Sequence, residues 1–201
     1  DPPKEGVKEA IALAHKAGID VVMITGDHPE TALAIGRQLG IAQSLTQVLT
    51  SVQMQDLSDD QLAQACQHIR IVARATPQDK VRIVKAYRLD EKIVAMTGDG
   101  VNDAPSLKQA DVGIAMGSGT EGSRQTSDLI LTDDNFATII SAVEEGRNIY
   151  LNIQKAVLYL LSCNLGEITT LFLAIVLMPV APAPLSAIQI LWINLVTDAF
   201  P

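Results

Sequence analysis

The distribution of charge along this chain is the feature that most limits what it can fold into. The sequence has 15 basic and 23 acidic side chains, but only Lys155, Glu167 and Asp198 lie beyond residue 150. The first 150 residues have the composition of a soluble acidic domain, whereas the remainder is apolar. We therefore expect a globular part followed by a part that lies in a membrane.

The apolar part is predicted to contain transmembrane helices. Residues 136–155 have the pattern of an amphipathic stalk helix, and residues 156–178 continue it as a span long enough to cross a bilayer core about 30 Å thick. "PVAPAP" then predicts a turn, and residues 185–201 start a second apolar segment. Basic residues precede the first span and are missing from the turn after it, which places the N-terminal part on the cytoplasmic side. The prediction is a multi-pass integral membrane protein with the lipid bilayer as a partner.

Residues 1–135 alternate between strand and helix patterns. Strands are expected at residues 20–24, 70–73, 92–96, 112–115 and 129–131. Helices are expected at residues 5–17, 29–39, 59–67, 77–87 and 102–109. Pro29 and Pro77 occupy first-turn positions, and Gly40 follows a helix where a C-terminal cap belongs. The alternation predicts an α/β fold with a parallel sheet flanked by helices.

Net charge and cysteine count argue against two other classes of protein, nucleic-acid-binding proteins and disulfide-rich proteins. A net charge of −8 gives no sign of nucleic-acid binding. Cys66 and Cys163 lie in different parts of the chain and do not indicate a disulfide framework. The chain begins at Asp1 and stops at Pro201 inside an apolar segment, so we expect a fragment of a longer protein.

Two loops at the expected carboxyl ends of strands have the residue types of a phosphate and metal site. "TGDGVND" contains Asp99, a carboxylate suited to Mg²⁺, followed by Asn102 and Asp103, which favour a helix start. "TGD" ends an earlier strand with Thr25, Gly26 and Asp27. A threonine hydroxyl and a glycine N–H suit a phosphoryl oxygen. Either loop alone is also explained as an ordinary turn.

A third loop, "ARATPQDK", offers Lys80 as a cation that offsets the charge of a phosphate. Alone, Lys80 is better explained as a solvated surface lysine. A threonine, a lysine and an aspartate pair from three strand ends together form the set that an aspartyl-phosphate enzyme needs.

In this order, "TGD", "ARATPQDK" and "TGDGVNDAP" resemble the phosphorylation domain of P-type ATPases, which has a haloacid-dehalogenase-like fold. The resemblance covers essentially the whole chain and is best to type II, calcium-pump-like members. It implies an enzyme that uses ATP and Mg²⁺ and couples ATP hydrolysis to cation transport through an aspartyl-phosphate. By this resemblance, Thr25 and Gly26 contact the phosphoryl group, Asp27 serves domain coupling and nucleotide handling, Lys80 contacts the phosphorylated aspartate, Asp99 ligates Mg²⁺, and Asn102 and Asp103 support that site.

The acceptor aspartate of this family lies in a "DKTGT" motif that the chain does not contain. The resemblance implies that the acceptor, the nucleotide-binding domain and the actuator domain lie upstream. Those remaining domains of the same polypeptide are expected partners, and the fragment alone is expected to be inactive.

Polar side chains recur on one face of each apolar segment. Asn164 and Glu167 are three residues apart in the first, and Asn194, Thr197 and Asp198 lie at i, i+3 and i+4 in the second. A carboxylate at bilayer depth costs roughly 2.5–3.5 kcal/mol, so it usually faces a cavity or a partner. These oxygens suit a hard cation. Hydrogen bonding between helices is the alternative, and for Thr197 alone it is the better one.

"NLGE" and "NLVTD" resemble the fifth and sixth transmembrane helices of calcium pumps. The resemblance implies that all five polar residues are ligands of the transported cation, with Ca²⁺ the expected ion. Sodium/potassium pumps typically have an aspartate where this chain has Asn194.

Two other functions compete with a cation pump. A membrane-anchored phosphatase of the same superfamily would have a short "DxD" nucleophile motif upstream, and it leaves Glu167 and Asp198 unexplained. A non-catalytic scaffold would have eroded loops, whereas Asp99, Asn102 and Asp103 are intact. We therefore predict an ATP-driven cation pump.

Overall fold

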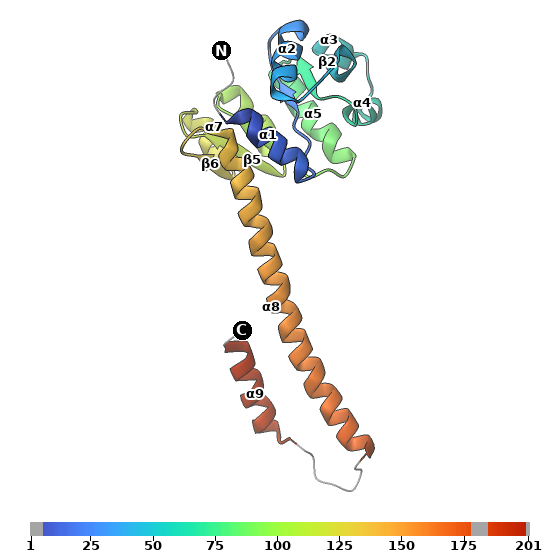
Figure 1. Ribbon diagram of the computed structural model, residues 1–201, viewed down its shortest axis with the longest axis vertical. Helices are drawn as coiled ribbons and strands as arrows, with labels where there is room; N and C mark the ends of the chain where they lie inside the picture. Colours follow the sequence, from blue (N-terminus) through green and yellow to red (C-terminus); the bar gives the residue numbers. More distant parts are fainter. Residues whose placement is uncertain (1–5, 178–184, 200–201) are drawn as a thin grey trace. The chain divides into compact units, whose positions relative to one another are not determined.

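The computed structural model describes residues 6–177 and 185–199 of the chain. It divides into two compact units, the first ending at Ala142 and the second beginning at Val143. All strands of the described residues belong to the first unit. The second unit consists of most of helix α8 (Phe136–Leu177) and of helix α9 (Ala187–Ala199). Figure 1 shows α8 as one continuous helix.

The first unit contains a three-stranded sheet with the strand order β1-β3-β2, and both strand pairs are parallel. Its strands are β1 (Met23–Ile24), β2 (Val48–Thr50) and β3 (Ile71–Ala73). The helices of this half are α1 (Val7–Lys16), α2 (Pro29–Leu39), α3 (Ser51–Gln55), α4 (Asp59–Cys66) and α5 (Pro77–Leu89), with a 3₁₀ turn, η1, at Leu45–Gln47.

Successive residues of β3 face opposite sides of this sheet. Ile71 packs in a buried cluster with Ile11 of α1 and Leu33 of α2. Val72 packs in another cluster with Met54 of α3 and Leu62 of α4. Both faces of the sheet are therefore covered by helices, as parallel sheets require.

A second parallel sheet in the same unit has the order β4-β5-β6. Its strands are β4 (Ala95–Gly98), β5 (Val112–Met116) and β6 (Leu129–Leu131). Between them lie the 3₁₀ turn η2 (Val101–Asp103) and helices α6 (Ala104–Gln109) and α7 (Glu121–Thr126). Ile114 of β5 packs against Ile139, so the first turns of α8 belong to the core of this sheet.

Local signals set several helix boundaries. Pro29 and Pro77 occupy the first turns of α2 and α5, and Gly40 ends α2 in the left-handed region at φ 79°. The Ser58 side chain caps α4 by accepting from the backbone N–H of Gln61. These boundaries are where first-turn prolines, a capping serine and a terminal glycine belong.

The predicted α/β fold with parallel strands and flanking helices is confirmed, with differences in detail. The strands form two hydrogen-bonded sheets rather than one. The strand expected at 92–96 lies at Ala95–Gly98, and Ile93 is exposed. The helix expected at 102–109 begins as the turn η2, and α6 starts only at Ala104. β2, α3 and α7 were not predicted. The predicted start of the first helix, Glu5, lies outside the described residues.

Beyond Lys155, the exposed side chains of the second unit are mostly apolar. Among the described residues, α8 is the one helix long and apolar enough to cross a membrane, and α9 is apolar but shorter. Three hydroxyls in α8 donate to the carbonyl four residues earlier, those of Ser162, Thr169 and Thr170. Such bonds satisfy a hydroxyl without water. The predicted span at 156–178 falls in α8 apart from Met178, and residues 200–201 of the second segment also lie outside the described residues.

Candidate functional site

The "TGD" loop after β1 is closed by its own side chains. The Thr25 hydroxyl donates to Asp27 Oδ2 at 2.9 Å and accepts from the Asp27 N–H at 3.1 Å. Gly26 between them is exposed. Two backbone bonds tie this loop to the one after β3, from Ala75 N to Thr25 O at 3.0 Å and from Arg74 N to Asp27 O at 3.1 Å. The "TGD" and "ARATPQDK" loops therefore form one connected edge.

The first turn of α5 positions Lys80. Thr76 caps the helix by accepting from Asp79 N at 3.3 Å, and the Asp79 carboxylate accepts from Thr76 N at 2.8 Å. The same buried carboxylate accepts from the Ser51 hydroxyl at 2.6 Å. Asp79, the residue before Lys80, is thus fixed by Thr76 and by Ser51, and this limits the positions that the Lys80 side chain can reach.

Asp103 lies at the centre of the candidate loops. Its Oδ1 lies 2.5 Å from Lys80 Nζ, and its Oδ2 accepts from the backbone N–H groups of Gly100 at 3.1 Å and Asp99 at 3.3 Å. Its exposed fraction is 4%, so these three bonds satisfy a buried charge that would otherwise be costly. The close approach depends on Gly98, where a Cβ would lie 2.5 Å from the Asp103 Cβ.

Asp99 and Asn102 differ from Asp103 because both are exposed. The Asp99 carboxylate makes no hydrogen bond within the described part of the chain. Among those residues there is also no group of three or more histidine, cysteine and acidic side chains that could hold a metal. Mg²⁺ usually binds one or two carboxylates and completes its shell with water and phosphate oxygens. One open carboxylate at a strand end fits that requirement.

The strands that precede the β1 and β4 loops share a core. Ile24 at the end of β1 packs against the cluster of Met96 in β4, Val84 in α5 and Leu107 in α6. Since ligands of parallel α/β sheets bind beyond the carboxyl ends of strands, this edge is the expected place for a phosphate.

The second unit brings three of the five predicted cation ligands together. With the Asn194 amide oriented to satisfy its neighbours, its nitrogen donates to both Glu167 carboxylate oxygens and to Asn164 Oδ1, each at 3.2 Å. α8 and α9 thus meet through polar groups in the apolar part of the second unit. Thr197 and Asp198 lie near the end of α9, and their side chains are outside the part that the structure describes.

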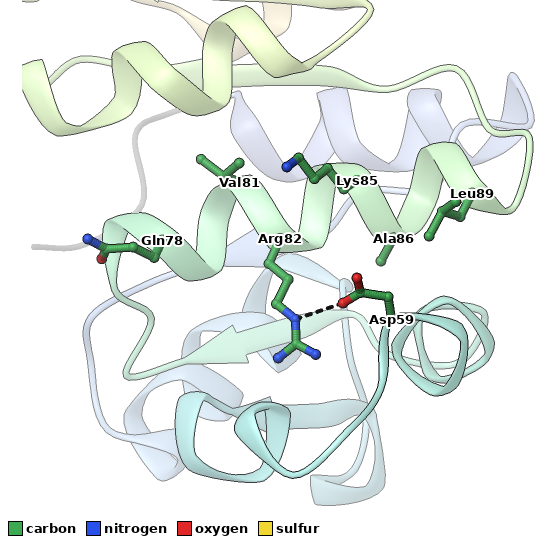
Figure 2. Close-up of a pocket in the computed structure, with 7 residues that line it drawn as sticks. All are labelled: Asp59, Gln78, Val81, Arg82, Lys85, Ala86 and Leu89. Carbon is green, nitrogen blue, oxygen red and sulfur yellow. Dashed lines mark hydrogen bonds and ion pairs between the residues drawn. The ribbon is translucent and has the colours of Figure 1, made fainter.

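A surface hollow of about 300 Å³ lies along α5, and its lining includes none of the predicted site residues. Its lining residues are Asp59, Gln78, Val81, Arg82, Lys85, Ala86 and Leu89. Figure 2 shows Arg82 reaching across it to Asp59, at 3.2 Å. Arg82 also donates to the carbonyl oxygens of Met54 and Leu57. All the bonding of Arg82 is therefore structural, since it joins α5 to the α3–α4 connection.

Sequence reasoning missed two residues that contact the backbone of Asp99. Thr120 N donates to Asp99 O at 2.9 Å, and the buried Ser123 hydroxyl lies 3.3 Å from the same oxygen. Both follow the glycine-rich stretch "GSG", which is the one local signal that pointed to a close backbone approach here.

Comparison with known proteins identifies the family of the first unit. A model of haloacid dehalogenase-like hydrolases matches residues 1–111, and a second model with the same description matches residues 81–143. The first match covers more than half of the chain and includes the three candidate loops.

Individual relatives match the chain from end to end. It is 55% identical to a calcium-transporting ATPase of Bacillus cereus over 100% of this chain and 22% of the relative, and 44% identical to a sodium/potassium exporting P-type ATPase of Schizosaccharomyces pombe over 100% of this chain and 21% of the relative. The crystal structure of a zinc-transporting PIB-type ATPase in the E2.Pi state matches with a TM-score of 0.66 at 27% identity, over 99% of this chain and 27% of that one. The chain thus spans about a fifth of its curated relatives, and the predicted resemblance to P-type ATPases is confirmed.

Proposed function

Because this chain belongs to the haloacid dehalogenase-like hydrolase family, we propose that it is part of an ATP-driven cation pump of the P-type ATPase class, with Ca²⁺ as the transported ion. One observation supports a pump above a phosphatase: the polar cluster of Asn164, Glu167 and Asn194 lies in the apolar C-terminal part of the same chain that has the candidate catalytic loops. A soluble-substrate phosphatase has no use for a carboxylate at membrane depth, where it is costly.

The catalytic role that we propose is to bind and orient a phosphoryl group carried by an aspartate elsewhere in the same polypeptide. Thr25 and Gly26 would offer a hydroxyl and a backbone N–H to the phosphoryl oxygens. Lys80 would offset their charge, since its ammonium already lies at this edge, 2.5 Å from Asp103. Asp27, whose carboxylate closes the first loop, would contact the nucleotide or its domain.

Asp99 is the residue that we propose as the Mg²⁺ ligand. Its carboxylate is exposed and unpaired within the described residues, whereas the Asp103 carboxylate is occupied by Lys80 and two backbone N–H groups. Bound Mg²⁺ would supply positive charge to the transferring phosphoryl group. Asp103 would hold the loop in shape, and the exposed Asn102 would support the same site.

The cation site that we propose joins α8 to α9. The Asn194 nitrogen now donates to Glu167 and to Asn164. If the Asn194 amide flipped, its oxygen would take the place of its nitrogen. The three side chains would then present only acceptor oxygens to a cation. With Thr197 and Asp198 they would form an oxygen shell with two carboxylates, which suits Ca²⁺. We place this unit in the bilayer and the catalytic loops on the cytoplasmic side.

The experiment compares two phosphorylation reactions of the full-length protein in membranes. Glu167→Gln and Asp198→Asn each remove one charge and keep the shape of the side chain. We expect phosphorylation by ATP to need a higher Ca²⁺ concentration, or to be lost, because the attraction for the cation falls. Phosphorylation by inorganic phosphate without Ca²⁺ should persist, which separates a ligand role from misfolding.

Glu145→Gln is the matched control, because it removes an exposed carboxylate of the same helix outside the apolar span. Its Ca²⁺ titration should equal that of the wild type. If Glu167→Gln and Asp198→Asn also leave the titration unchanged, these carboxylates are partners within the helix bundle and the proposed ion or site is wrong.

A further inference from the structure

The segment from residue 117 to residue 123, here called the strap, lies against the backbone of the Asp99 loop. Asp99 O accepts from Thr120 N at 2.9 Å. The Ser123 hydroxyl donates to Thr120 O at 2.8 Å and lies 3.3 Å from Asp99 O. Ser123 is fully buried. The Asp99 carbonyl is therefore held by two groups of one short segment.

The strap can approach Asp99 this closely only because of Gly119. A Cβ at position 119 would lie 3.0 Å from Asp99 O and 2.9 Å from Met116 O. Backbone oxygens cannot move aside as a flexible side chain can, so any larger residue would push the strap away from the loop. The contact is thus a property of the packed fold and not of two adaptable surface side chains.

The other end of the strap is anchored on the turn between β6 and α8. Gly117 N donates to Leu131 O at 2.8 Å, and Ser118 N donates to Asp134 Oδ1 at 3.1 Å. Asp134 is half-buried and has a left-handed backbone, with φ 51°. The residue before it, Asp133, accepts from the Thr138 hydroxyl in the first turn of α8 at 2.5 Å. The anchor of the strap and the start of α8 are therefore the same turn.

We propose that the strap is a positioning element that aims the Asp99 carboxylate from the start of α8, with Ser123 and Asp134 as its positioning residues. The proposal rests on the proposed function, in which Asp99 binds Mg²⁺. No side-chain bond within the described residues orients the Asp99 carboxylate, so its direction depends on the backbone that carries it. That backbone is held on one side by Asp103 and on the other by the strap.

The test is the Mg²⁺ dependence of phosphorylation by ATP in the full-length protein, with Mg²⁺ itself as the probe. Ser123→Ala and Asp134→Gly should raise the half-saturating Mg²⁺ concentration by about 3- to 10-fold, the size expected for one weakened hydrogen bond. Glycine at 134 keeps the left-handed backbone accessible and removes only the acceptor. Asp134→Asn restores an acceptor oxygen and should return the half-saturating concentration to the wild-type value.

Thr126→Ala is the matched control, because the Thr126 hydroxyl also donates to a carbonyl of α7, that of Gly122, without touching the Asp99 loop. If Ser123 and Asp134 had a purely structural role, their substitution would lower thermal stability and leave the half-saturating Mg²⁺ concentration unchanged. An unchanged concentration in Ser123→Ala, or in Asp134→Gly, would overturn the proposal. Asp99→Asn distinguishes the proposed Mg²⁺ role of Asp99 from the proposed role of the strap. If Asp99→Asn also leaves the Mg²⁺ dependence unchanged, the proposed role of Asp99 is wrong. If Asp99→Asn alone shifts the Mg²⁺ dependence, only the proposed role of the strap is wrong.

Discussion

Replacement of Gly98 by alanine is predicted to displace Asp103 and to loosen the candidate catalytic loops. The added Cβ would lie 2.5 Å from the Asp103 Cβ and 2.9 Å from its Cγ, whereas carbon atoms in contact are about 3.5–4.0 Å apart. Asp103 would therefore have to retreat by about 1 Å. Its Oδ2 accepts from Gly100 N at 3.1 Å and from Asp99 N at 3.3 Å, so both bonds would exceed normal hydrogen-bond length.

The free-energy cost of this substitution has two sources. Overpacking costs about 1–3 kcal/mol, and a hydrogen bond to a charged group contributes about 1.5–3 kcal/mol. Because one movement relieves the clash and stretches the bonds together, these contributions do not simply add, and we expect a loss of about 2–4 kcal/mol. At 1.4 kcal/mol for each factor of ten, this corresponds to amide exchange in β4 that is about 30- to 700-fold faster.

Hydrogen exchange of the full-length protein, followed by mass spectrometry of the peptide containing β4, measures this effect. Gly26→Ala is the matched control, since a Cβ there meets no atom within 4 Å. It should leave exchange in β1 and β4 unchanged and affect only phosphoryl binding. Exchange in β4 of Gly98→Ala within about threefold of the wild type, together with normal phosphorylation, would refute the claim that Gly98 is required for the packing of Asp103.

Three further predictions concern titration and mechanics. Burial raises the pKa of Cys66 to about 11, so alkylation of its thiol should be slow at neutral pH, and fast labelling at pH 7 would contradict this. The contribution of the buried neutral thiol to the free energy of unfolding should be lost as pH rises from about 9 through 11. Hydrogen bonds from Thr138 and Asn135 lower the pKa of Asp133, so the small stabilising effect of the ionised Asp133 should be lost only as pH falls through that lowered pKa. Thr138→Val should raise the pKa of Asp133 in a titration followed by NMR. A flexible Gly-Ser insertion after Arg147, in α8, should spare phosphorylation and abolish transport, and normal ion uptake by that variant would exclude a rigid coupling role for α8.

Most of the local structure of the first unit could be predicted because short-range signals set it. The strand at 129–131 agrees with β6, and the first-turn prolines and Gly40 bound helices where expected. β2 (Val48–Thr50) was missed because its last residue, Thr50, also caps the helix that follows at once, α3. A polar capping residue inside a strand hides the strand pattern.

For the candidate site, the sequence predicted which residues belong to the loops but not which of those residues contact one another. The loops with Thr25, Lys80 and Asp99 were identified from composition and resemblance. The ion pair of Lys80 with Asp103 and the bond of Ser123 to the Asp99 loop were not predicted, because each joins segments that are 23 and 24 residues apart in sequence. Which polar groups meet across such distances depends on how α5, α6 and α7 pack, and no local pattern records that.

The purely parallel pairing of both sheets has a consequence for how the protein is made. Met23 of β1 pairs with Ile71 of β3, so the first strand cannot find its partner until the ribosome has added nearly fifty more residues, and such distant pairings form slowly. Translation delivers β4, β5 and β6 afterwards, and then the apolar helices α8 and α9. The order of synthesis therefore lets β1 pair with β3 before the apolar part of α8 has been made. A substitution that slows the pairing of β1 with β3 would reduce the yield of folded protein and leave the activity of each folded molecule unchanged.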